Sequence, residues 1–241
     1  MKAICKYAFI PVRYEARESA EMETQILYGE TFSVLETQGK WKKIRLDFDG
    51  YEGWIDAKLH TPVATDVYDR YIEKKRHIVS TPHTTIHPAD CSHPLLITGG
   101  SETTEPTTNA KNNIIDTARL FLGSPYLWGG RTFFGIDCSG FTQIVYKIHG
   151  IALPRNASQQ IELGQLIEFI DDIKEGDLAF FDNDEGKITH VGLCVDNHTI
   201  IHASGCVRID ALDHYGIYNN DRNCYTHTLR AIKRVTPCSK K

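Results

Sequence analysis

Three residues in the C-terminal half of the chain have the types needed for nucleophilic catalysis: Cys138, His190 and His202. Cys138 lies in the segment 137–140, where an apolar pattern of helical period begins. A cysteine in the first turn of a helix faces unpaired backbone N–H groups and the positive end of the helix dipole, which favour the thiolate. We therefore expect a stabilised thiolate at Cys138 that acts as a nucleophile. A small buried side chain is the alternative for any single cysteine.

The two histidines lie on neighbouring predicted strands, 190–195 and 199–203, which the polar residues 196–198 connect. If the strands pair so that Gly192 faces His202, both imidazoles lie on one face as diagonal neighbours, roughly 7–8 Å apart by Cα. One ring can then accept the thiol proton while the second holds the orientation of the first. A two-residue turn would instead place the two rings on opposite faces.

Changes in apolar period predict the elements that position these residues. Residues 114–122 carry apolar side chains at helical spacing, and Gly123 ends that run. A second helix is predicted to begin near Cys138 and to end at Gly150, with one apolar stripe. Four later segments have the pattern of strands: 177–181, 190–195, 199–203 and 229–235. Helices followed by a run of antiparallel strands predict an α+β fold.

Residues 1 to about 65 have a different pattern, in which short apolar runs alternate with turn signals at close spacing. Turn residues bracket the segment 41–46, as expected for a strand. These features predict a small β-barrel. The layout also resembles bacterial SH3 domains, and the resemblance rests on Gly29-Glu30, Trp41 and the segment 50–55. Packing in any small barrel is the alternative explanation for each aromatic residue taken alone.

Between these two regions the chain is harder to assign. Residues 78–80 and 95–98 are candidate strands that would lengthen the first domain. The segment 99–108 is rich in Gly, Ser, Thr and Pro, which predicts a linker. We therefore expect three parts: an SH3-like barrel at 1–72, extra strands and a linker at 73–108, and a second domain at 109–241.

The spacing of possible metal ligands gives no reason to expect a metal ion or another cofactor. His83, His87 and His93 match no metal-ligand spacing, so solvated loop histidines are the expected reading. A three-ligand zinc site formed by Cys138 and the two later histidines remains an alternative to thiol catalysis, because the residue types suit both.

Composition excludes several classes of protein. The chain has 241 residues, 41% of them hydrophobic and 24% charged, so it should fold. Its formal net charge is −4 and it has no extended basic block, which argues against a nucleic-acid partner. No apolar run approaches the ~20 residues that cross a bilayer. The N-terminal residues lack the pattern of an export signal, and the seven cysteines contain no C-x-x-C pair.

A close resemblance emerges from six segments taken in order. They are 126–130 (YLWGG), 137–141 (DCSGF), 153–155 (LPR), 176–181 (GDLAFF), 189–192 (THVG) and 201–204 (IHAS). Together they resemble the NlpC/P60 cysteine peptidases over about residues 110–235. The resemblance implies a papain-like core in which helices pack on an antiparallel sheet. It further implies that Cys138 is the nucleophile, His190 the general base and His202 the orienting residue.

The same resemblance implies roles for residues around the nucleophile. Tyr126 would help to bind the oxyanion together with the backbone N–H of Cys138, while Asp137 and Ser139 match the family's substrate-binding positions. Packing beside a hinge is the alternative for Tyr126. Two further residues are candidates for a substrate carboxylate, although neither is favoured for it: Arg131 and Arg155.

An SH3 domain before the catalytic domain resembles one branch of the family, which acts on stem peptides with a free N-terminal L-Ala. In that branch the SH3 domain closes part of the cleft, and acidic and tyrosine side chains hold the substrate ammonium. A buried cation needs a carboxylate partner. Glu21 and Tyr51 are our candidates from the SH3 part, and Glu18 and Glu23 are alternatives.

The sequence thus predicts a cysteine peptidase that cleaves the bond between γ-D-Glu and a diamino acid in peptidoglycan-derived peptides, without a cofactor. Because no export signal is evident, we expect the cytoplasm and a role in recycling of wall peptides. A periplasmic or extracellular location is the alternative if the sequence is truncated. The competing functions are an exported hydrolase of intact cell wall and a non-catalytic wall-binding module.

Overall fold

The computed structural model describes residues 1–89, 91–105 and 113–236, which form two compact units. Unit 1 comprises residues 1–110 together with Trp128–Phe133, and unit 2 comprises 111–127 and 134–241. The segment Trp128–Phe133 therefore belongs to unit 1, although it lies close in sequence to the predicted nucleophile. Within the described residues, no helix combines the length and the hydropathy needed to span a membrane.

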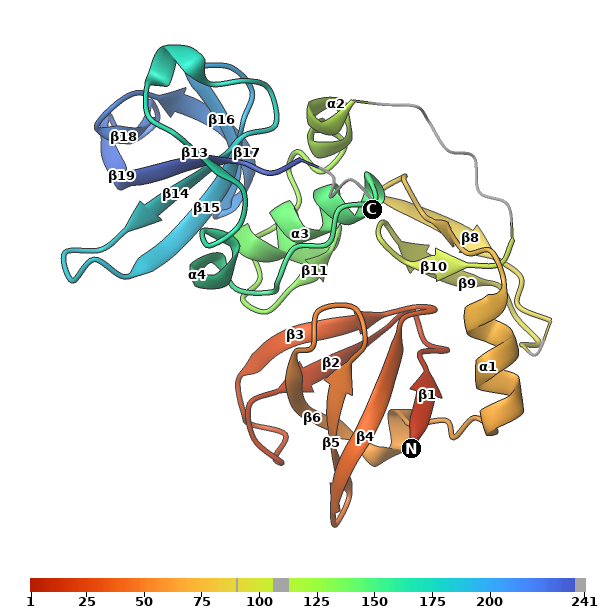
Figure 1. Ribbon diagram of the computed structural model, residues 1–241. Helices are drawn as coiled ribbons and strands as arrows, with labels where there is room; N and C mark the ends of the chain where they lie inside the picture. The colour runs from red at the N-terminus through yellow and green to blue at the C-terminus, as the bar shows by residue number, and fades with distance from the viewer. Residues whose placement is uncertain (90, 106–112, 237–241) are drawn as a thin grey trace. The chain divides into compact units, whose positions relative to one another are not determined.

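Unit 1 is built on a six-stranded antiparallel sheet with the order β1-β4-β5-β6-β2-β3 (Figure 1). Its strands are β1 (Lys2–Ile4), β2 (Phe9–Arg13), β3 (Met22–Leu27), β4 (Thr31–Gln38), β5 (Trp41–Leu46) and β6 (Glu52–Asp56). Apolar side chains of these strands pack together in a single core, which includes Ile10, Val12, Ile26, Phe32, Ile44 and Ile55. This is the SH3-like barrel predicted from the alternation of short apolar runs and turns.

The region after the barrel contains more regular structure than its sequence suggested. It holds a 3₁₀ turn (Ala57–Leu59), α1 (Thr65–Glu73), β7 (His77–Ile78), β8 (His83–Ile86), β9 (Leu95–Thr98) and β10 (Glu102–Thr103). The linker predicted at 99–108 is wrong for its first part, because β10 pairs with β7 and Ser101 is fully buried. Residues 106–108 of that prediction lie outside the described residues. Helix α1 was missed because only Tyr68 is buried along it.

The segment Trp128–Phe133 is held in unit 1 by a buried ion pair and a close backbone contact. The guanidinium of Arg131 donates to both carboxylate oxygens of Glu30 at 2.9 Å, and its Nη1 also donates to the carbonyl of Gln25 at 2.6 Å. Gly129 has a φ of +75°, and a Cβ there would lie 2.4 Å from the carbonyl oxygen of Met22. Arg131 is therefore a structural residue of unit 1, and not an exposed group awaiting a substrate carboxylate.

Unit 2 places its helices before a large antiparallel sheet, as predicted for an α+β fold. Its first elements are α2 (Ile114–Arg119), β12 (Gly135–Ile136), α3 (Cys138–Ile148) and α4 (Ala157–Gln160), and unit 1 contributes β11 (Arg131–Thr132) between them in sequence. The sheet contains β13 (Gln165–Ile167), β14 (Leu178–Asp182), β15 (Ile188–Cys194), β16 (Thr199–Ser204), β17 (Cys206–Leu212), β18 (Gly216–Asn219) and β19 (Cys224–Arg234), with a 3₁₀ turn at Ile170–Asp172.

The sheet of unit 2 closes on itself. Its order is β13-β19-β14-β15-β16-β17-β18, and β18 pairs with β19 as well as with β17. Six strands thus form a closed barrel, and β13 lies at the edge. Helices α3 and α4 pack against β15 (Figure 1). The helix that begins at the predicted nucleophile is therefore held against the strand that carries the predicted base.

Candidate active site

Cys138 is the first residue of α3, as the sequence predicted. Asp137 is the N-cap, and its Oδ1 accepts a hydrogen bond from the backbone N–H of Gly140 at 2.7 Å. The Cys138 side chain is buried and bonds to the backbone N–H of Val191, the residue after His190 in β15. The start of α3 thus brings the sulfur to the backbone of the strand that carries the histidine.

The network around the helix start already uses the carboxylate of Asp137. Nη1 of Arg155 donates to Oδ1 of Asp137 at 3.0 Å and to Oγ of Ser139 at 2.9 Å, while Nη2 donates to Oδ2 of Asp137. All three side chains are buried. Arg155 therefore holds the helix start in place, and any substrate group that meets Asp137 would share its carboxylate with a guanidinium.

The two histidines adopt the register that the sequence suggested. Gly192 of β15 faces His202 of β16, and the N–H of Val195 bonds to the carbonyl of Thr199 at 2.9 Å. Nε2 of His190 lies 2.7 Å from Nδ1 of His202, so the two rings form a hydrogen bond within a buried site. Both imidazoles lie on one face of the sheet, and the alternative with a two-residue turn is wrong.

Two further residues join this cluster that the sequence reasoning missed. Nε2 of His202 lies 3.0 Å from Oδ2 of Asp210, in β17. His227, in β19, stacks on His190 with ring centroids 4.2 Å apart and an interplanar angle of 28°. A hairpin around Gly205 would have paired 199–204 with 206–212 and placed Asp210 beside His202. His227 was missed because β19 begins at Cys224, before the predicted strand at 229.

Burial controls the ionisation of the reacting groups. It raises the pKa of the Cys138 thiol to about 12, and the nearby carboxylate of Asp137 acts in the same direction. Hydrogen bonds from the backbone of Val191 lower that pKa but do not compensate. Burial also lowers the pKa of His190 well below its ordinary value, helped by His202 and His227. Both pKa shifts therefore run against the stabilised thiolate that the sequence predicts at Cys138.

Tyr126 lies at the mouth of the same site. Its backbone N–H bonds to the carbonyl of Gly205 at 2.9 Å, and its half-buried hydroxyl is near Cys138. Burial, followed by the charges that Cys138 and Asp137 can carry, raises its pKa, so the hydroxyl stays a donor. A cleft of about 380 Å³ opens here, lined by Tyr126, Thr189, His190, Ala203, Ser204, Gly205 and His227. The histidine predicted as base therefore faces an accessible cavity.

Comparison with known proteins agrees with this arrangement. The model of the NlpC/P60 family matches residues 123–228, and the model of the bacterial dipeptidyl-peptidase Sh3 domain matches residues 12–58. A gamma-D-glutamyl-L-lysine dipeptidyl-peptidase of Bacillus subtilis is 32% identical over 218 residues, which cover 76% of this chain and 72% of the relative. The chain belongs to the NlpC/P60 family. It is a cysteine peptidase, as the sequence predicted.

Two further NlpC/P60-type comparisons cover most of the chain. An enzyme of Bacillus cereus, also named gamma-D-glutamyl-L-lysine dipeptidyl-peptidase, is 28% identical over 76% of this chain and 67% of its own length. The crystal structure of an NlpC/P60 family protein from Bacillus cereus superposes with a TM-score of 0.83 at 23% identity, covering 98% of this chain and all of that one. The second comparison establishes the fold.

The two substrate-binding residues predicted in the SH3-like part of this NlpC/P60 protein have different surroundings within unit 1. The hydroxyl of Tyr51 donates to the carboxylate of Glu23, and both side chains are half-buried. Glu21 is exposed, and Glu18 pairs with Lys40 at 2.6 Å. Of the three acids considered from the sequence, Glu23 is the one that bonds to Tyr51.

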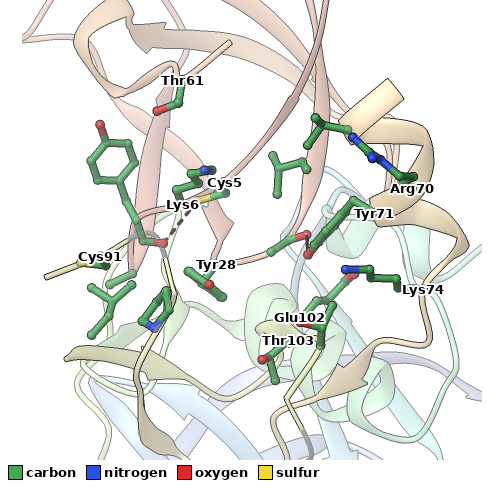
Figure 2. A pocket seen from close by; sticks show the side chains of 18 of the residues that line it. Cys5, Lys6, Tyr28, Thr61, Arg70, Tyr71, Lys74, Cys91, Glu102 and Thr103 are labelled. Atoms are coloured by element: carbon green, nitrogen blue, oxygen red, sulfur yellow. Dashed lines mark hydrogen bonds between the residues drawn. The ribbon is translucent and has the colours of Figure 1, made fainter. Parts of the chain in front are cut away.

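A larger cavity, of about 660 Å³, lies in unit 1 (Figure 2). Figure 2 shows its tyrosines and basic side chains, and the hydroxyl of Tyr71 donates to the carbonyl of Gly29 at 2.8 Å. Cys91 and His93 line it and lie 3.6 Å apart on one loop, but no third side chain among the described residues orients that ring. The cleft of unit 2, which is lined by His190 of the hydrogen-bonded histidine pair, is therefore the better candidate for the active site.

The zinc alternative and a disulfide both depend on how the described cysteines and histidines are grouped. Among these residues, no group of three or more His, Cys, Asp or Glu side chains is arranged to hold a metal ion. The six described cysteines are free thiols. His83 is exposed in β8 and its ring lies 6.1 Å from that of Phe133.

Proposed function

We propose that this protein hydrolyses the bond between γ-D-Glu and a diamino acid in peptidoglycan-derived peptides, with Cys138 as nucleophile. The observation that carries the proposal is the buried hydrogen bond of 2.7 Å between His190 and His202, beside a cysteine that opens a helix packed on the same strand. The relatives named gamma-D-glutamyl-L-lysine dipeptidyl-peptidase support the substrate class.

In the proposed reaction, the Sγ of Cys138 attacks the γ-carbonyl carbon of D-Glu while His190 accepts the thiol proton. Proton transfer accompanies attack, because burial opposes a free thiolate in the resting site. The backbone N–H of Cys138 and the hydroxyl of Tyr126 donate to the oxyanion, and one such donor is worth about 3 kcal/mol. His190 then protonates the leaving amine, and water hydrolyses the thioester.

We further propose that the preferred substrates are short fragments with a free amino terminus, released during recycling of wall peptides in the cytoplasm. A dipeptidyl-peptidase removes two residues from an amino end, so the names of the two relatives support this form of substrate. Asp137 and Ser139, together with Glu21 and Tyr51, are the proposed substrate-binding residues. Because Tyr51 bonds to Glu23, the matched test of the acid is Glu21→Gln beside Glu23→Gln.

The deciding experiment compares L-Ala-γ-D-Glu-L-Lys with its N-acetylated form and with intact sacculi, using mass spectrometry to identify products. We expect release of L-Ala-γ-D-Glu from the free tripeptide, and a kcat/KM at least ~10-fold lower for the acetylated peptide, because a hydrogen bond to a buried charge is worth about 1.5–3 kcal/mol. Equal cleavage of sacculi would identify an exported wall hydrolase. The absence of any cleavage would favour a wall-binding module.

A further inference from the structure

The pair of histidines continues into a third buried group. Oδ2 of Asp210 lies 3.0 Å from Nε2 of His202, and His202 in turn lies 2.7 Å from His190. Asp210 is only 4% exposed, so its carboxylate is buried where it contacts the His202 ring. The hydrogen-bonded series from His190 through His202 therefore ends at Asp210, a residue that the sequence analysis did not predict as part of the site.

The partners of Asp210 keep its carboxylate ionised. Nη2 of Arg208 donates to Oδ1 at 2.8 Å, and Nε of Arg208 lies 2.7 Å from Oδ2. Burial alone would raise the pKa of Asp210, but hydrogen bonds from His202 and Arg208 hold it below its ordinary value. The amide of Asn219, in β18, lies 3.3 Å from Oδ2 and can also donate. Each of these neighbours donates to the carboxylate or is positioned to do so.

An ionised carboxylate can only accept hydrogen bonds, and this fixes the proton on each ring in turn. His202 must carry its proton on Nε2 to donate to Asp210, which leaves Nδ1 as an acceptor. Nε2 of His190 must therefore carry a proton to donate to His202. The lone pair of His190 is then on Nδ1, the ring nitrogen not engaged by His202.

Building on the proposed function, we infer that Asp210 is a positioning residue that acts through His202 to keep His190 in the tautomer able to accept the proton of Cys138. In the opposite tautomer Nδ1 of His190 carries a hydrogen, and the ring cannot act as a base toward the thiol. The remaining titratable neighbour, His227, stacks on His190 and lies 5.7 Å from His202 by ring centroids. Burial lowers the pKa of His227 to about 4, so this ring is neutral near pH 7. It therefore adds no charge that would reverse the direction of the hydrogen bonds from His190 to His202 and from His202 to Asp210.

The first test is Asp210→Ala in the full chain, assayed with L-Ala-γ-D-Glu-L-Lys. We expect kcat to fall at least ~10-fold with KM changed less than ~3-fold. Without Asp210 the His190 ring would populate both tautomers, whereas the contacts with the substrate would remain. Asp221→Ala is the matched control, since Asp221 also accepts from Nη2 of Arg208, at 2.7 Å, but has no contact with His202. We expect that control to stay within ~2-fold of the parent, and equal losses in both variants would contradict the inference.

The second test observes the protonation of the two rings directly and does not depend on turnover. In the ¹⁵N-labelled Cys138→Ala chain, NMR should show both His190 and His202 protonated at Nε2 at neutral pH. Introducing Asp210→Ala should convert part of each ring to the Nδ1-protonated form. The two failures are separate: unimpaired turnover by Cys138→Ala contradicts the proposed function, whereas a His190 ring protonated at Nδ1 beside an intact Asp210 contradicts this inference whatever the activity.

Discussion

Each unit of the protein buries a guanidinium against a carboxylate, and the two pairs serve different ends. In unit 1, Arg131 and Glu30 are 0% and 1% exposed, and Glu30 also accepts from the backbone N–H of Leu27 at 2.8 Å. That pair ties the segment Trp128–Phe133 to the barrel. In unit 2, Arg155 and Asp137 are also buried, but their carboxylate caps the helix that presents Cys138.

The comparison shows that burial of charge does not by itself mark a site of chemistry. The guanidinium of Arg131 donates to the carbonyl of Gln25 and to the carboxylate of Glu30, and the backbone N–H of Arg131 donates to Oε1 of Gln25, all within unit 1. In the β-barrel of unit 2 the polar chain from Asp210 ends instead at a histidine that faces a cleft. A functional network is recognised by a reactive atom at its end, and four predictions test this distinction.

The largest expected effect is at the reactive end of unit 2. Cys138→Ala should lower kcat at least ~10⁴-fold, because no other atom in the site can form the thioester. Alanine is tolerated at the start of a helix, so the thermal unfolding midpoint should hardly change. Steady-state assays with the free tripeptide give the rate, and calorimetry gives the midpoint. Cys224→Ala, an exposed thiol in β19, is the control that should keep full activity.

Next in size is the difference between the two histidines of the hydrogen-bonded pair. His190→Ala should lower kcat roughly 10³-fold, because it removes the base, whereas His202→Asn should lower it only about 10-fold, because an amide can still orient the ring. The same tripeptide assay measures both. Equal losses would mean that the division into base and orienting residue is wrong. A chelator should change neither rate, and zinc-dependent recovery after chelation would favour the metal alternative.

Breaking the pair in unit 1 should cost stability without touching the proposed chemistry. Arg131→Ala leaves the carboxylate of Glu30 buried without its cation, which typically destabilises a protein by about 3 kcal/mol or more. The free energy of unfolding from urea titration measures the loss. The double variant Arg131→Met with Glu30→Leu should recover most of it, because apolar side chains of similar size need no partner. Lys40→Ala, which removes an exposed pair with Glu18, should leave the unfolding transition unchanged.

How far the sequence predicted this site depends on the range of each signal. The cap at Asp137, the helix after it and the pairing of β15 with β16 come from residues close in sequence, and local pattern was enough to find them. Asp210 contacts His202 because β17 pairs with β16 in the next hairpin. A single acidic residue in a strand of polar and apolar residues has no local sequence pattern that identifies it as part of a site. The ionisation of Cys138 depends on burial by distant elements, so the helix start alone predicted the wrong direction.

The smallest expected effect is a pH dependence of stability caused by His227. Burial lowers its pKa in the folded state to about 4, below the ordinary value near 6.5 that it has when unfolded. Between these two values the unfolded chain binds more protons than the folded one, so stability is present above about pH 6.5 and is lost as the pH falls toward 4. Burial lowers the pKa of His190 in the same direction.

Replacing His227 by Gln removes one group that binds a proton in the unfolded state but not in the folded state between pH 6.5 and 4. The decline in thermal midpoint between pH 6.5 and 4 should therefore be shallower in His227→Gln than in the parent. His214→Gln is the control, because that ring is exposed beside Tyr215 and should leave the slope unchanged.

His227→Gln also uncovers His190, whose pKa should move up toward its ordinary value as water reaches the ring. The acid limb of kcat/KM would then shift to higher pH, and a limb that stays in place while the stability slope changes would mean that His227 does not shield the base.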